Sequence, residues 1–90
     1  MQHVFKNSQI LLDAISCVLR EERVKSGKSA RMLAYEYDLH VSMISRAENS
    51  KNDIKVTSIY ALCEALNIPV DVFFNKVKNK LPQDFSLLDF

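Results

Sequence analysis

The stretch "HVSMISRAENSK", residues 40–51, decides how this chain folds. It places one inward-facing apolar anchor, Ile44, in a run that is otherwise mostly polar and contains no glycine. Such a run predicts a short helix that contributes little to a core. The opposite side of that helix, at positions i, i+1, i+4 and i+5, carries Val41, Ser42, Ser45 and Arg46. These side chains predict an outer face that is kept for contacts other than core packing.

Length and composition limit the remaining possibilities. Ninety residues, 48% of them hydrophobic, suit a single domain with one core over residues 1–90. The formal charge is +1, so neither a basic nor an acidic excess over the whole chain points to a partner. Any surface that binds nucleic acid must therefore be basic locally.

The cysteines and the apolar segments indicate the compartment. Cys17 and Cys63 lie far apart and lack the spacing of a metal site, so we expect both to be buried free thiols in a reducing cytoplasm. The apolar positions near the N-terminus are interrupted by Asp13 and Arg20 before they reach a membrane-spanning length. The sequence therefore predicts neither a signal peptide nor a transmembrane segment.

Hydrophobic periodicity predicts an all-α chain, and one glycine and two prolines give little support for tight β-turns. We expect five helices, over residues 8–26, 30–37, 41–49, 56–67 and 69–80. Gly27 should stop the first helix and Ser29 should cap the second. The core-facing positions are expected to be Leu11, Ile15, Val18, Leu19, Met32, Leu33, Tyr37, Val56, Ile59, Leu62, Cys63 and Leu66, with Met43 as a gap-filler.

Two of the expected helices, 30–37 and 41–49, are short and joined by a tight turn. Inside a bundle of three further helices, this arrangement is a helix-turn-helix, whose second helix enters the major groove of DNA. Its geometry needs a small residue where the two helices touch, an apolar residue in the turn and an inward anchor on the second helix. Ala34, Leu39 and Ile44 meet these requirements.

The stretch "SARMLAYEYDLHVSMISRAENSKNDIKVTSIYALCEALNIPVDVFF", residues 29–74, resembles the Cro and phage-repressor type of helix-turn-helix domain, called the Xre family in bacteria. Its most specific part is "ISRAENSK", and the similarity extends over residues 19–74. The resemblance implies a five-helix bundle like that of lambda repressor, followed by a C-terminal extension, residues 75–90. It also implies a sequence-specific, double-stranded DNA-binding regulator of transcription from a bacterium, phage or mobile element.

The resemblance implies roles for individual residues. Base-reading positions of the family match Val41, Ser42, Ser45 and Arg46, and positions near the phosphate backbone match Lys28, Ser29, Arg31, His40, Asn49, Lys51, Asn52 and Lys55. Arg23 and Glu48 match a partly buried ion pair that joins the first and third helices. Ala30 replaces a glutamine that grips phosphate in the family, and glycines are commoner at the positions of Asp38, Ser50 and Asn67.

Enzymatic activity is not expected. The chain has no phosphate-cradling loop, nucleophile elbow or dinucleotide fingerprint, and no cluster of acidic and histidine residues for a metal, so no cofactor is implied. The alternative function is a protein-interaction module, or an antitoxin with the same fold, in which Val41 and Met43 face a protein partner. Residues 20–51 contain seven Lys or Arg against five Asp or Glu, which favours DNA weakly.

The apolar tail "LPQDFSLLDF", residues 81–90, follows the family-like region. It can pack on the chain's own core beside the start of the first helix, or on a second copy of the chain. A helix-turn-helix protein needs a two-fold dimer to place two recognition helices about 34 Å apart on a palindromic operator. We therefore expect a homodimer anchored by Phe85 and Leu88.

Overall fold

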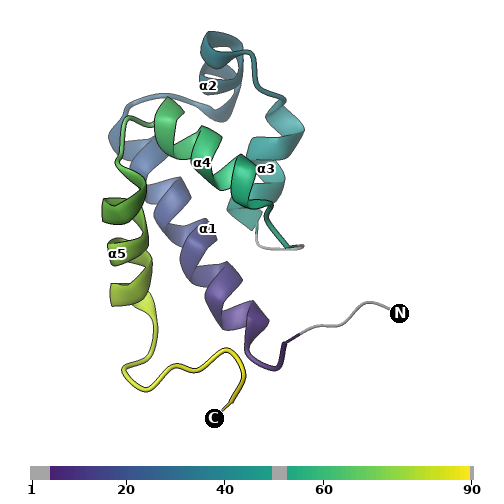
Figure 1. Ribbon diagram of the computed structural model, residues 1–90. Coiled ribbons are helices and arrows are strands. Elements are labelled where there is room, and N and C mark those ends of the chain that lie inside the picture. Colours follow the sequence, from purple (N-terminus) through teal and green to yellow (C-terminus); the bar gives the residue numbers. More distant parts are fainter. Residues whose placement is uncertain (1–4, 50–52, 90) are drawn as a thin grey trace.

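The computed structural model describes residues 5–49 and 53–89. These residues form five helices and no strand: α1 (Ser8–Lys25), α2 (Ala30–Tyr37), α3 (Val41–Asn49), α4 (Val56–Ala65) and α5 (Val70–Lys80). The long α1 packs against α3 and α5, α2 packs against α3, and the C-terminal segment returns toward the start of α1 (Figure 1). The predicted all-α, five-helix architecture is confirmed, and each predicted helix end lies within two residues of the observed one.

Local signals set the helix ends. The Ser29 hydroxyl accepts a hydrogen bond from the Met32 backbone N–H at 3.1 Å, which satisfies one free donor at the start of α2. Gly27 follows α1 with φ 75°, and Asp38 and Asn67 turn the chain after α2 and α4 with φ 55° and 56°. Asp and Asn adopt this left-handed conformation more readily than other non-glycine residues. Two of the three positions where the similar family commonly has glycine therefore keep the geometry that the fold needs, and the third, Ser50, lies outside the described residues.

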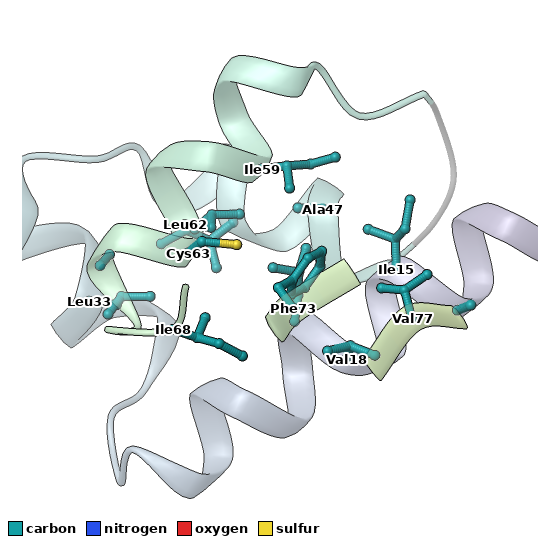
Figure 2. Packing of buried hydrophobic residues seen from close by; sticks show 14 of the residues in the cluster. Ile15, Val18, Leu33, Ala47, Ile59, Leu62, Cys63, Ile68, Phe73 and Val77 are labelled. Carbon is teal, nitrogen blue, oxygen red and sulfur yellow. The ribbon is translucent and has the colours of Figure 1, made fainter. Parts of the chain in front are cut away.

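The core surrounds Phe73 of α5. Its ring is fully buried and lies among side chains that come from α1, α3 and α4 (Figure 2). The other buried apolar residues are Ala14, Ile15, Val18, Leu19, Leu33, Ala34, Ile44, Ala47, Ile59, Leu62, Cys63, Ala65, Ile68 and Val77. A single cluster thus joins all five helices, including the two short ones that could not fold alone.

Some apolar residues that the periodicity assigns to the core are exposed, and these predictions were wrong for Met32, Tyr37 and Val56. The eight-residue α2 turns only Leu33 and Ala34 fully inward. Val56 is 78% exposed because it begins α4, one turn before the first buried residue of that helix. Both errors arise at the edge of the core, where the position of neighbouring helices decides burial. Met43 does pack against the core, as predicted.

The two cysteines differ, although both were expected to be buried. Cys17 is exposed on α1, with its sulfur 3.7 Å from a carboxylate oxygen of Glu21, so this prediction was wrong. Cys63 is fully buried in α4, and burial raises the pKa of its thiol to about 11. The Cys63 thiol therefore stays protonated at neutral pH and acts as a small apolar side chain.

Ion pairs on the surface tie α5 to α1. Lys76 Nζ lies 2.9 Å from Glu22 Oε2, and Lys80 Nζ lies 2.9 Å from Glu21 Oε2. The hydrogen bond from Lys76 is the largest cause that lowers the pKa of the Glu22 carboxyl, followed by the opposing effect of burial. The Lys80–Glu21 pair is the more exposed of the two and adds little stability, whereas the Glu22 carboxylate is only 13% exposed.

No single helix in the described ranges has both the length and the apolar composition to cross a membrane. The pair α4 and α5 reaches that length and composition together, with a bend of 108° between its two helices.

Phe73→Ala should lower the free energy of unfolding by about 3–5 kcal/mol, because it empties the centre of the core. Phe74→Ala is the matched control, since Phe74 is the next residue of the same helix and is 42% exposed. Urea denaturation followed by circular dichroism measures both. Equal losses in the two variants would contradict the central role of Phe73.

Candidate nucleic-acid interface

The two short helices form a compact unit. The chain leaves α2 at Asp38, and the Leu39 N–H donates to the Ala34 carbonyl at 2.8 Å, which closes the turn. Leu39 packs at the edge of the core, as the predicted turn plug should. From the second helix, Ile44 and Ala47 are each only 1% exposed. The pair α2 and α3 therefore has the apolar contacts that a helix-turn-helix requires.

The outer face of α3 is open to solvent. Its exposed residues are Val41, Ser42, Ser45, Arg46 and Asn49, which follow the expected spacing of one helical face. In contrast, Met43 is partly buried against the core. The four residues predicted to read bases thus lie together on this face. Met43, which the alternative function places against a protein partner, is less exposed than Val41.

The C-terminal end of α3 is fixed to α1 by two polar contacts. The Arg23 guanidinium makes two hydrogen bonds to the Glu48 carboxylate, from Nε to Oε2 at 2.6 Å and from Nη2 to Oε1 at 3.0 Å. The two side chains are only 16% and 11% exposed. The hydrogen bond to Glu48 is the main cause that raises the pKa of Arg23, so this guanidinium is charged at neutral pH.

The second contact comes from Ser16, a buried polar residue of α1. The Ser16 hydroxyl is buried and donates to the Ala47 carbonyl oxygen at 2.6 Å. Carbonyls in the last turn of a helix lack an intrahelical partner, so this bond satisfies a group that would otherwise be buried without one. The sequence signal that could have predicted this contact is spacing. Ser16 lies on the same side of α1 as Leu19 and Arg23.

Several residues predicted to contact phosphate are open to solvent. Ser29 uses an oxygen lone pair to cap α2, which leaves its hydroxyl hydrogen free to donate. Arg31, His40 and Lys55 are exposed at the start of α2, before α3 and before α4. His40 and Lys55 line one hollow together with Ser42 and Arg46 of the open face of α3.

Other predicted phosphate contacts are already engaged or fall outside the described part of the chain. Lys28 Nζ lies 2.7 Å from a carboxylate oxygen of Glu36 and 5.5 Å from the centre of the Tyr37 ring. The Asn49 amide turns back onto Ser45. Lys51 and Asn52 lie outside the described residues.

Unpaired positive charge gathers at the helix-turn-helix. Within residues 5–49 and 53–89, the cations without an ion pair are Arg20, Arg31, Arg46, Lys55 and Lys78. Three of these five, Arg31, Arg46 and Lys55, lie on α2, on α3 and just before α4. The surface therefore carries available cations where the exposed face of α3 is, although the chain as a whole is nearly neutral.

A hollow of about 530 Å³ opens between α3 and the start of α4. It is lined by His40, Ser42, Met43, Arg46, Ala47, Asp53, Ile54, Lys55 and Ser58. Hydroxyls and cations dominate its polar lining, with one carboxylate, so it suits the edge of a phosphate-bearing ligand. Across the described residues, no group of three or more His, Cys, Asp or Glu side chains could hold a metal ion.

Comparisons with known proteins agree with this geometry. The sequence profile of a helix-turn-helix family, HTH_3, matches residues 19–73. The restriction-modification controller protein C.Esp1396I is 26% identical to this chain. Its tetramer in complex with its natural 35 base-pair operator has a TM-score of 0.71, and the match covers 78% of this chain and 92% of that one. The wild-type protein gives a TM-score of 0.70 with coverage of 78% and 91%, at the same 26% identity. No curated protein matches the chain in sequence.

Glu48→Ala should lower the free energy of unfolding by about 3 kcal/mol, because it leaves the largely buried Arg23 guanidinium without its carboxylate. Glu21→Ala is the control, since it removes an exposed pair with Lys80 and should leave the melting temperature close to that of the parent. Thermal denaturation compares the three proteins. If Glu48→Ala melts with the control, the pair is not shielded.

Proposed function

We propose a mode of action from one premise: the chain belongs to the helix-turn-helix family HTH_3 and is a DNA-binding transcriptional regulator. In this proposal it binds a palindromic operator as a homodimer, with α3 of each copy in the major groove. Residues 19–74 form the DNA-binding core, and residues 75–90 contribute to the dimer. We further propose that it acts in the cytoplasm and catalyses no reaction.

The observation that carries the proposal is the exposed face of α3, which is fixed to α1 at its C-terminal end and carries Arg46, with Lys55 lining the hollow beside it. A rigid helix is needed because base edges are read by hydrogen bonds of defined direction. Cations are needed because phosphate contacts supply much of the affinity and set the register on the duplex. Both features occur together at α3.

The side chains of this face have different chemical capacities. Arg46 can hold a guanine by two hydrogen bonds to O6 and N7, and Val41 can contact a thymine methyl group. Ser42 and Ser45 offer single hydrogen bonds. Ser29 and Lys55 can hold phosphates on either side, together with Arg31 and His40. Arg46 is therefore the side chain on which we expect base preference to depend most.

In this proposal the C-terminal segment contributes to the dimer, and in the structure it contacts the start of the chain's own α1. The Asn7 amide donates to the Ser86 carbonyl at 2.5 Å, and Lys6 pairs with Asp89 at 2.6 Å, so the tail lies beside the start of α1. Phe85 is half-buried in this position, whereas Leu88 is 54% exposed. Leu88 is accordingly the better placed of the two proposed dimer anchors. The similar protein C.Esp1396I is a tetramer on its operator, which is consistent with association of copies.

Binding-site selection from random DNA duplexes tests the function. We expect enrichment of one palindromic sequence whose half-sites are about one helical turn apart. A failure to enrich any sequence, by a protein that circular dichroism shows to be folded, would contradict sequence-specific binding and favour the protein-interaction alternative.

Arg46→Ala should weaken binding to the selected site by about 1–3 kcal/mol and relax the preference at one base pair. Lys55→Ala should instead weaken binding to all sequences alike and reduce the slope of log affinity against log salt by about one. Fluorescence anisotropy at several salt concentrations, on selected and random duplexes, separates the two effects. Equal weakening of both duplexes by Arg46→Ala would identify Arg46 as a phosphate contact.

Leu88→Asp should convert a dimer to a monomer in sedimentation equilibrium at high micromolar concentration, because it places a charge in an apolar contact between copies. The circular dichroism spectrum should show that the monomer stays folded. Val24→Asp is the control, since Val24 is a 62% exposed apolar residue at the other end of α1. A parent chain that is already monomeric rejects the dimer. Unfolding of Leu88→Asp would show that the tail serves the chain's own core.

A further inference from the structure

We propose that Asn49 fixes the hydrogen-bonding direction of Ser45, so that Ser45 meets the operator as a hydrogen-bond donor and selects a base with an acceptor on its major-groove edge. This inference rests on the proposed function, because it concerns the face of α3 that would enter the groove. It assigns Asn49 a role as a positioning residue in place of the predicted phosphate contact.

The orientation of the Asn49 amide follows from its two contacts. Asn49 Nδ2 lies 2.6 Å from the Ser45 carbonyl oxygen, and a carbonyl can only accept a hydrogen bond. The group that faces this carbonyl must therefore be the amide NH₂ and not the amide oxygen. The same nitrogen lies 3.1 Å from Ser45 Oγ, so its second hydrogen is available to the hydroxyl oxygen.

The direction of the Ser45 hydroxyl then follows from that of the amide. An amide NH₂ cannot accept, so Ser45 Oγ is the acceptor in this contact and its own hydrogen points elsewhere. Within the described residues, the Ser45 hydroxyl donates to no other group. A hydroxyl that accepts from one partner is polarised and becomes a better donor to the next. Ser45 therefore offers its hydrogen to whatever approaches the face.

Position on the helix makes this donor relevant to base reading. Ser45 lies one turn after Val41 and one turn before Asn49 on the exposed face of α3. In the major groove, guanine O6, purine N7 and thymine O4 accept hydrogen bonds, whereas the amino groups of cytosine and adenine donate. A fixed donor at Ser45 favours a base that presents one of these acceptors and disfavours cytosine, whose major-groove edge carries only an amino donor. A serine free to rotate could serve either.

Binding-site selection with full-length variants tests the inference. Ser45→Ala should reduce the preference at one base pair by roughly fivefold, the effect of one hydrogen bond. Asn49→Asp should move the preference at that same pair toward an amino-bearing base, because a carboxylate accepts the Ser45 hydrogen and turns the oxygen lone pairs outward. Asn49→Ala should relax the preference without moving it.

Thr57→Asp is the matched charge control, since it adds the same negative charge at an exposed position in the first turn of α4. It should weaken binding and leave the selected sequence unchanged. In addition, ¹⁵N NMR of the free protein should show that Ser45→Ala shifts the Asn49 side-chain amide signals, while Ser42→Ala leaves them in place.

The outcomes separate the two levels of the proposal. If the parent chain enriches no sequence, the proposed function fails and takes this inference with it. If the parent enriches a site, but Asn49→Asp does not move the preference at the Ser45 base pair and Asn49→Ala does not relax it, the inference alone is overturned. If Asn49→Asp does not fold by circular dichroism, Asn49→Ala decides: unchanged preference at the Ser45 base pair overturns the inference, and relaxed preference supports it.

Discussion

The bidentate contact between Arg23 and Glu48 is the constraint on which the functional part of the molecule depends. The same guanidinium also donates from Nη1 to the Lys28 carbonyl at 3.0 Å, just before the cap of α2. One side chain at the end of α1 thus holds both the entry to α2 and the exit from α3. Because helices of eight and nine residues are unstable alone, their relative orientation must be imposed from outside, and Arg23 does so.

This arrangement meets two opposing requirements on α3, which must expose one face for binding and must also be held firmly against the core. A helix that presents Val41, Ser42, Ser45 and Arg46 to solvent retains only Ile44 and Ala47 as fully buried residues. Two buried side chains, one of them an alanine, do not fix a helix in rotation and translation. Directional polar bonds from Arg23 and Ser16 supply the missing precision at one end, and the tight turn at Asp38 supplies it at the other. The outer face of α3 can therefore be polar while the position of the helix in the bundle stays fixed.

The sequence predicts this fold well where the determining signals are local. Helix ends follow from Ser29, Gly27 and the left-handed tolerance of Asp38, which act over a few residues. Burial at the edge of the core was predicted less well, because the exposure of Met32 and Val56 depends on how far neighbouring helices extend. In the candidate site, spacing alone placed the outer face of α3, and family resemblance suggested the Arg23 partner. The contacts of Ser16, Lys28 and Asn49 were missed, since each depends on a side-chain direction that no sequence spacing specifies.

The left-handed corners have a consequence for the denatured ensemble. In addition to Gly27, the chain uses Asp38, Asn67 and Asp89 at positive φ. A residue with a Cβ atom explores fewer backbone conformations than glycine when the chain is unfolded, which is worth about 0.4–1 kcal/mol where the native angles are tolerated. The local strain of a left-handed Asp or Asn opposes this gain. At the corners after α2 and α4, the chain therefore loses less backbone conformational entropy on folding than it would with glycine. This matters in a small domain, whose core is small.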